Sequence, residues 1–496
     1  MDSKRLYLAV AACAIVVHLG ALWNRFAMDD LYIIVWNPLV HAGDGLWRAF
    51  VSPYWPPDLG GKLYRPLTVA TYTIDGLVGG GYAWWFHGVN LVWHSGAAVA
   101  VTALARRWAG ATTALVAGLL FAVHPVHVEA VANVIGRAEL MAGLFVCLAV
   151  YAAVVRHSVG WSALAIAAGL LCKENAAVAP ALILWAWWVG FSRPARHRML
   201  AFVGSWLAIA AVYVAVRGAV LSPYARLHDI APVFISQSAV AERLTAVAAL
   251  SDVVRLLVFP LTLRVDYSPA ERTIVTSVFD ARFFLGLAAL TLWAGLLVAA
   301  WRHQRKVEAF GLGWIGIAYL PVANFLLPVG VLLAERTLYL PSVGLAVAAG
   351  AALARLPAPR LRAVAAVLVL AGGIRSALRV PVWHDDAAVT LSILDDSPNS
   401  YRGPARMGAL YQSRGDAVQA LAALRLAART FDRDPTLFIA GADAAFTLGR
   451  PALADSLLLH AELLCYHCYG LYRTQALAAR ARGDSAVADS LLKRGR

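Results

Sequence analysis

Two adjacent carboxylates in this sequence have the types and spacing that acid/base chemistry needs. Asp29 and Asp30 come directly after the first apolar run, in the segment FAMDD. Adjacent carboxylates can hold a divalent cation, or one can act as a general base while the other orients it. The alternative is that either residue only caps a short helix over 31–36. If the protein holds a metal ion, Asp29 and Asp30 are its expected ligands, and no other cofactor is predicted.

A second polar group lies in the segment HPVHVE. His124, His127 and Glu129 fall within six residues, which suits a metal site or an acid/base relay. Their spacing after a proline fits no standard zinc pattern. The alternative interpretation is structural, with both imidazoles bonded to the backbone of the loop.

Further cations and carboxylates occur in short segments between apolar runs. We predict that four cations together bind an anionic group such as a phosphate, and these are Arg65, Arg137, Lys173 and Arg336. We assign substrate binding to the polar residues near them, which are Glu139, Glu174, Asp266, Tyr267 and Glu335. The alternative is internal ion pairing, for example between Lys173 and Glu174.

The elements that must position these residues are membrane-spanning helices. The 496-residue chain is 60% hydrophobic and 15% charged, against about 45–50% and 25% in soluble domains. The partner is therefore a lipid bilayer. The net charge of +14 does not indicate nucleic acid, because the basic residues cluster at the ends of apolar runs. The run over 6–23 is interpreted as an uncleaved anchor and not a signal peptide.

Apolar runs predict eleven crossings. They lie at 6–23, 84–104, 111–123, 138–155, 161–172, 176–191, 200–217, 283–301, 308–325, 338–354 and 363–379. With these spans every basic cluster falls on the cytoplasmic side, together with the N-terminus. Parity then makes 250–263, which Pro260 interrupts, a re-entrant or interfacial helix or two short spans. The polar segments and the C-terminal tail are expected outside.

The tail repeats with a period of 34 residues. Gly415, Gly449 and Gly483 share this spacing, and so do the two series Ala420, Ala454, Ala488 and Leu424, Leu458, Leu492. This is the period of tetratricopeptide helix pairs, with a generic Ala-rich helical bundle as the alternative. We therefore predict an all-α protein, with a membrane domain over 1–380 and three tetratricopeptide-like repeats forming an α-solenoid over 381–496. Cys465 and Cys468 are expected to form a local disulfide, with free thiols or half of a metal site as alternatives.

Several motifs in their order resemble the transmembrane and tetratricopeptide-repeat-containing O-mannosyltransferases. They are Asp29-Asp30, YRPLT at 64–68, FHGVN at 86–90, HPVHVEAV at 124–131, GRAE at 136–139, Lys173-Glu174, VDYSP at 265–269 and AERTLYLPS at 334–342. The similarity extends over essentially the whole chain. One departure is that eukaryotic members often carry more repeats than the three found here.

The resemblance implies a GT-C-type glycosyltransferase that uses a polyprenyl-phosphate-linked sugar donor, with mannose as the sugar, and a protein or peptide hydroxyl acceptor. By position Asp29 would be the general base with Asp30 beside it, and His124, His127 and Glu129 would complete the site. The composition favours a bacterial inner membrane with periplasmic repeats, and a eukaryotic protein would place them in the ER lumen. The alternatives are a glycan or lipid acceptor for the same donor, and a non-catalytic envelope scaffold that recruits a partner through its repeats.

Overall fold

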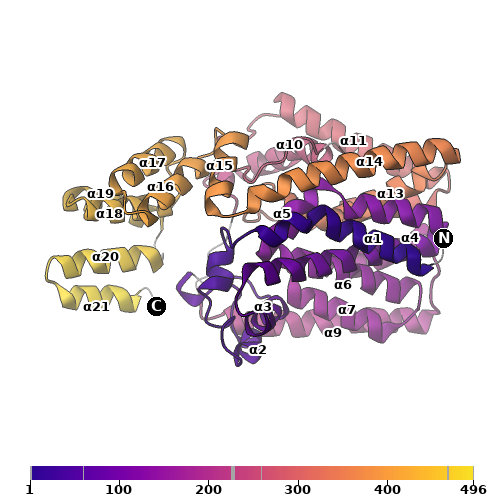
Figure 1. Ribbon diagram of the computed structural model, residues 1–496, viewed down its shortest axis with the longest axis horizontal. Helices are drawn as coiled ribbons and strands as arrows, with labels where there is room; N and C mark the ends of the chain where they lie inside the picture. The colour runs from indigo at the N-terminus through magenta and orange to yellow at the C-terminus, as the bar shows by residue number, and fades with distance from the viewer. Residues whose placement is uncertain (1–2, 60, 225–229, 259, 466–468, 495–496) are drawn as a thin grey trace.

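The computed structural model describes residues 3–59, 61–224, 230–258, 260–465 and 469–494, and within these ranges helices are the only regular secondary structure. This confirms the all-α prediction. Long helices lie side by side in one bundle, and shorter helices that include the C-terminal ones gather at one end of it (Figure 1). Cys468 lies outside the described residues, so its expected disulfide with Cys465 stays a prediction.

The bundle has an apolar core to which many of its helices contribute. The helices of the bundle are α1 (Ser3–His18), α4 (Ala83–Ala122), α6 (Arg137–Val154), α7 (Val159–Cys172), α8 (Ala179–Val189), α9 (Arg196–Leu221), α11 (Ala281–Arg302), α12 (Lys306–Tyr319), α13 (Tyr339–Leu353) and α14 (Ala358–Arg379). Helix α4 packs against α1, α6 and α13, so it lies at the centre.

Seven helices in the described ranges are long and apolar enough to cross a bilayer. They cover Ser3–Trp23, Ala83–Ala122, Val134–Val154, Arg196–Leu221, Ala281–Arg302, Glu335–Leu353 and Ala358–Trp383. The remaining expected spans are also helical, but α7, α8 and α12 have only 14, 11 and 14 residues. The expected spans 84–104 and 111–123 are the two arms of α4, which folds back on itself at Gly110 with φ 82°, so that His94 in the first arm contacts the Ala122 carbonyl in the second at 3.1 Å. Glycine adopts this angle without steric cost, so the chain bends there.

The outer helices of the bundle expose apolar side chains. Leu207 on α9, Leu285 on α11 and Leu370 on α14 are each at least 60% exposed. A soluble protein rarely leaves whole helices of this kind uncovered, whereas lipid chains cover them without cost. The chain is therefore a multi-pass membrane protein.

Helix α10 (Ala239–Val258) occupies the segment whose topology the sequence left open. It begins before residue 250, packs along α11, and ends two residues before Pro260. Proline lacks the N–H that the next turn would need, which accounts for the end of the helix.

The C-terminal part consists of helix pairs that follow the 34-residue period. The pairs are α16 (Arg402–Ser413) with α17 (Ala417–Thr430), α18 (Pro435–Thr447) with α19 (Pro451–Leu464), and α20 (Tyr469–Ala481) with α21 (Ser485–Arg494). Gly415, Gly449 and Gly483 each lie in the turn within a pair, with φ of 80°, 66° and 84°. Left-handed backbone of this kind ends a helix and favours glycine. The repeating alanines are fully buried, as helices that pack closely require.

The repeats lie at the same end of the bundle as the long segment after α1. That segment contains α2 (Gly45–Arg48) and α3 (Pro66–Val78), and α20 contacts the turn Pro57–Leu59. Helix α15 (Asp386–Asp396) connects the bundle to the first repeat (Figure 1). One end of the bundle therefore carries both the Asp29 segment and the repeats.

Candidate active site

The two adjacent carboxylates have different surroundings. Asp30 is 1% exposed, and its oxygens accept N–H bonds from Ile135 at 2.9 Å and from Ala27 at 3.2 Å. Asp29 is partly exposed, and in the described part of the chain its carboxylate accepts no hydrogen bond. Asp30 makes no capping bond to the turn Leu31–Val35 that follows it. Asp30 therefore fixes the fold of the segment, while Asp29 is free to act on a ligand.

Burial raises the pKa of the Asp30 carboxyl to about 7, although the bonds from Ile135 and Ala27 favour its ionised form. The folded protein therefore binds a proton that the unfolded chain, with a pKa near 3.8, has already released. Stability is expected to fall as the pH rises from about 4 to 7 and to level off above that range. In Asp30→Asn this contribution is absent.

The test is the thermal unfolding midpoint of the wild type and of Asp30→Asn in detergent between pH 4 and 8. The unfolding midpoint of Asp30→Asn, relative to that of the wild type, should increase as the pH rises through this window. A difference that is constant with pH would contradict a raised pKa at Asp30.

Glu129 and Arg336 form an ion pair beside this segment. Glu129, in the short helix α5 (Val128–Ala132), is 2% exposed and accepts the Arg336 backbone N–H at 2.8 Å as well as its guanidinium. The Arg336 side chain keeps 30% of its surface exposed and interacts electrostatically with Asp29 and with Glu139. Arg336 is thus a cation that a ligand can reach near the free carboxylate.

Two more ion pairs adjoin Arg336. Lys173 pairs with Glu139, and Arg65 donates to Glu174 at 2.9 and 3.1 Å. Burial is the main reason why the pKa of Lys173 is lowered, Glu139 opposes the shift, and the cations Arg65 and Arg336 add to it. The three basic side chains are therefore close enough to repel one another, and each is held by a carboxylate from another segment. None pairs with its sequence neighbour, which the alternative of internal pairing had suggested.

The histidines have mainly structural contacts. His124 Nε2 contacts the Leu257 carbonyl at 2.9 Å, and its Nδ1 accepts the Val126 N–H at 3.3 Å. His127 is completely buried, and its Nε2 contacts Ser342 Oγ at 2.7 Å. Burial lowers the pKa of His124 to about 4, so the ring is neutral at physiological pH. Both rings lie against bundle residues, whereas Glu129 joins the Arg336 pair.

Arg137 lies within the bundle. It is completely buried, and its guanidinium pairs with Asp75, donates to Asn90 at 2.9 Å and to the Phe86 carbonyl at 3.0 Å, and stacks over Tyr72. These contacts neutralise the Arg137 charge within the bundle. They also account for the FHGVN motif, because Phe86 and Asn90 accept hydrogen bonds from Arg137.

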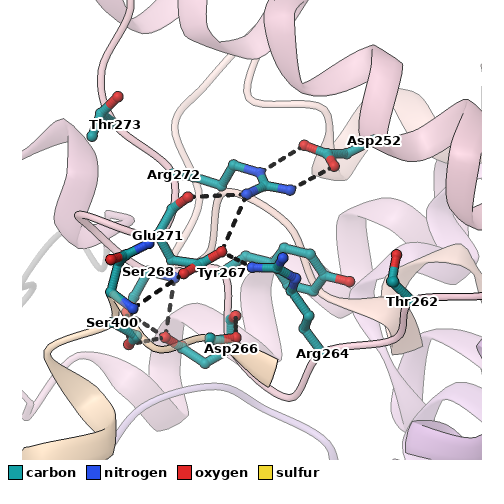
Figure 2. A network of polar contacts seen from close by, with 12 residues as sticks. Asp252, Thr262, Arg264, Asp266, Tyr267, Ser268, Glu271, Arg272, Thr273 and Ser400 are labelled. Atoms are coloured by element: carbon teal, nitrogen blue, oxygen red, sulfur yellow. Dashed lines mark hydrogen bonds and ion pairs between the residues drawn. The ribbon is translucent and has the colours of Figure 1, made fainter. Parts of the chain in front are cut away.

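The loop with Asp266 and Tyr267, between α10 and α11, contacts the start of the repeats. The Asp266 carboxylate accepts bonds from Ser268 and Ser400 (Figure 2). Arg402, at the start of α16, lies 3.4 Å from the same carboxylate. The Tyr267 hydroxyl donates to Glu335 at 3.1 Å. The sequence did not point to Ser400 or Arg402, since neither belongs to a motif.

A pocket of about 290 Å³ lies along α10 next to this loop. Its polar lining comes from Thr245, Ser251, Asp252, Glu271, Arg272, Thr273 and Arg282, and its apolar lining includes Leu332 and Leu333. Arg272 is held by Asp252 through two bonds of 2.8 Å (Figure 2). Leu333 is three residues before Arg336, so the pocket adjoins the segment that carries this cation.

The described residues contain no group of three or more His, Cys, Asp or Glu that could hold a metal ion. Each Asp30 oxygen accepts one backbone N–H group. A divalent cation at Asp29 and Asp30 stays a prediction.

These features define a helical, multi-pass membrane protein with a charged site at the end of the bundle that also carries its repeats. No protein-family model matches the chain. Its curated relatives are protein O-mannosyl-transferases. The Caenorhabditis elegans protein F38B6.6 is 27% identical over 351 residues, covering 68% of this chain and 50% of that protein. Human TMTC4 is 29% identical over 486 residues, covering 84% of this chain and 65% of TMTC4.

The resemblance predicted from the motifs is confirmed: the chain is similar to the protein O-mannosyl-transferases. A shorter match of 38% identity, to Drosophila melanogaster Tmtc2, covers 34% of this chain and 20% of that protein. The chain spans one half to two thirds of the length of the first two relatives. Among solved structures, ArnT from Cupriavidus metallidurans bound to undecaprenyl phosphate is weakly similar, with a TM-score of 0.41, 16% identity, and coverage of 96% of this chain and 78% of that one.

Proposed function

We propose that this protein is a membrane glycosyltransferase that moves a sugar, mannose by analogy with its relatives, from a polyprenyl-phosphate carrier to a Ser or Thr hydroxyl of a protein. The observation that carries the proposal is the free Asp29 carboxylate within the electrostatic range of the accessible cation Arg336. The names of the relatives, protein O-mannosyl-transferases, support the class of reaction.

The reaction needs a base on one side of the sugar and positive charge on the other. The acceptor oxygen attacks the anomeric carbon and forms the new C–O bond while its proton passes to Asp29. The bond from the anomeric carbon to the phosphate oxygen breaks, and the lipid phosphate leaves with the electron pair. Arg336, supported by Lys173 and Arg65, stabilises the charge that develops on this phosphate. Attack opposite the leaving group inverts the anomeric configuration.

The other predicted residues keep the site in place. Glu129, Glu139 and Glu174 orient the three cations, and Asp30 fixes the backbone beside Asp29. We assign Arg137 and the two histidines to positioning of the bundle instead of contact with the donor. We further propose a membrane domain over 1–380 with its N-terminus in the cytoplasm, and an extracytoplasmic repeat domain over 381–496 that handles the acceptor.

The proposal is tested by comparing glycopeptides from envelope proteins of host cells with the gene, without it, and with Asp29→Asn. We expect hexose-modified Ser and Thr peptides only in the first case. Glycopeptides that are unchanged in all three strains, with a glycan or lipid altered instead, would contradict a protein acceptor.

A further inference from the structure

The segment that leads to Asp29 is attached along the junction between the membrane helices and the repeats. Asn24 Nδ2 donates to the Val380 carbonyl at 3.4 Å, and the Arg25 N–H donates to the His384 carbonyl at 2.7 Å. The Met28 N–H donates to Asp386 Oδ1 at 2.6 Å. Three successive contacts thus align residues 24–28 with residues 380–386.

An apolar cluster fills the space beneath these contacts. It includes Ala21 and Ala27 from the segment before Asp29, and the other buried members are Val128, Ala132, Val380, Trp383, Val389 and Ile393. Helix α5, which carries Glu129, therefore packs in the same cluster as α15. A shift of α15 changes the support of both the base segment and the carboxylate that holds Arg336.

Asp386 connects this junction to the first repeat. The oxygen that accepts the Met28 N–H also accepts Arg406 Nη2 from α16 at 2.8 Å. Tyr32 interacts electrostatically with Arg406, Asp386 and Asp29, so these three charges lie near one side chain. Asp386 therefore contacts both the first repeat, through Arg406, and the segment before Asp29, through Met28.

The backbone at Met28 needs such support. Met28 has φ 55°, in the left-handed region that side chains with a Cβ rarely adopt, and it directly precedes Asp29. Residues in strained conformations persist where surrounding contacts over-determine them, and they cluster at functional sites. The Met28 N–H bond to Asp386 is a contact of this kind.

We infer that Asp386 is a positioning residue that holds the left-handed turn at Met28 and thereby sets Asp29 for proton transfer, with Arg406 linking this position to the repeats. The inference rests on the proposed function for the role of Asp29. Because a small misplacement of a catalytic group can lower the rate by about 100-fold, loss of the Asp386 acceptor should lower kcat and leave the KM for the donor unchanged.

The experiment uses the full-length protein in detergent and combines kinetics with hydrogen exchange measured by mass spectrometry. In Asp386→Ala we expect amide exchange of the peptide over 24–33 to rise at least tenfold, exchange of the peptide over 137–154 to stay unchanged, and kcat to fall about 10- to 100-fold. Asp386→Asn keeps an acceptor oxygen for Met28 and should recover most of both losses. Arg406→Gln keeps the Met28 bond and should resemble Asp386→Asn.

Asp395→Ala is the matched control, since Asp395 is an exposed carboxylate on the same helix and should change neither readout. Unchanged exchange over 24–33 in Asp386→Ala would overturn the inference, and so would faster exchange spread over the whole chain. If the wild type transfers no sugar, the proposed function fails, and exchange over 24–33 still decides whether Asp386 holds the turn.

Discussion

Replacing Asp29 by Asn is expected to lower kcat for sugar transfer by about 10²–10⁴-fold, the contribution that a positioned general base makes. An amide has nearly the size of a carboxylate but does not accept the hydroxyl proton. The Asp29 side chain is partly exposed and accepts no hydrogen bond within the described residues, so the variant should unfold at the wild-type temperature. Transfer assays and thermal unfolding of the purified variant measure the two effects.

Asp44→Asn is a suitable control for this variant. Asp44 lies in the same long segment after α1, and its only salt bridge to a described residue is an exposed pair with Arg48 at 3.3 Å. It should retain wild-type activity. Equal activity of Asp29→Asn and Asp44→Asn would exclude Asp29 as the base, whereas loss of activity together with early unfolding would show a structural role.

Replacing Arg137 by Met is expected to lower the free energy of unfolding by about 3–5 kcal/mol, because it leaves a buried carboxylate without its partner. Arg137 is completely buried and the Asp75 side chain is 5% exposed, so water cannot replace the lost contact. The matched variant Arg48→Met, in the exposed pair with Asp44, should cost at most about 1 kcal/mol. Unfolding titrations in mixed micelles compare the two variants.

A second substitution separates structure from donor binding at Arg137. Asp75→Leu in the Arg137→Met background removes the unpaired carboxylate and should recover part of the lost stability. A phosphate-binding role predicts the opposite pattern, with wild-type stability and a raised KM for the donor. That pattern would contradict the internal role assigned here.

The sequence predicted the features of the fold that depend on local patterns. Apolar runs marked the helices of the bundle because lipid and core both select for such runs, and the glycines at 415, 449 and 483 marked the repeats because each occupies a left-handed turn. The gap between the expected spans 84–104 and 111–123 corresponds to the turn at Gly110, where the two arms of α4 fold back on each other.

The site depends on contacts between residues that are far apart in the sequence, and local sequence patterns do not predict such contacts. Charge type and sidedness indicated Lys173 and Arg336, but their partners Glu139 and Glu129 lie 34 and 207 positions away. Helical periodicity does not encode such pairings. For the same reason the two adjacent carboxylates at 29 and 30 looked equivalent, although one faces the backbone of Ile135.

The most direct measurement is sugar transfer by the purified full-length protein in lipid nanodiscs, from labelled polyprenyl-phosphate mannose to a peptide that contains Ser and Thr. We predict labelled peptide with an inverted anomeric configuration, and no label when Ser and Thr are replaced by Ala or when the enzyme is Asp29→Asn. Failure to label the peptide from any polyprenyl-phosphate hexose, or equal labelling by Asp29→Asn, would contradict a polyprenyl-phosphate-dependent transferase with Asp29 as its base.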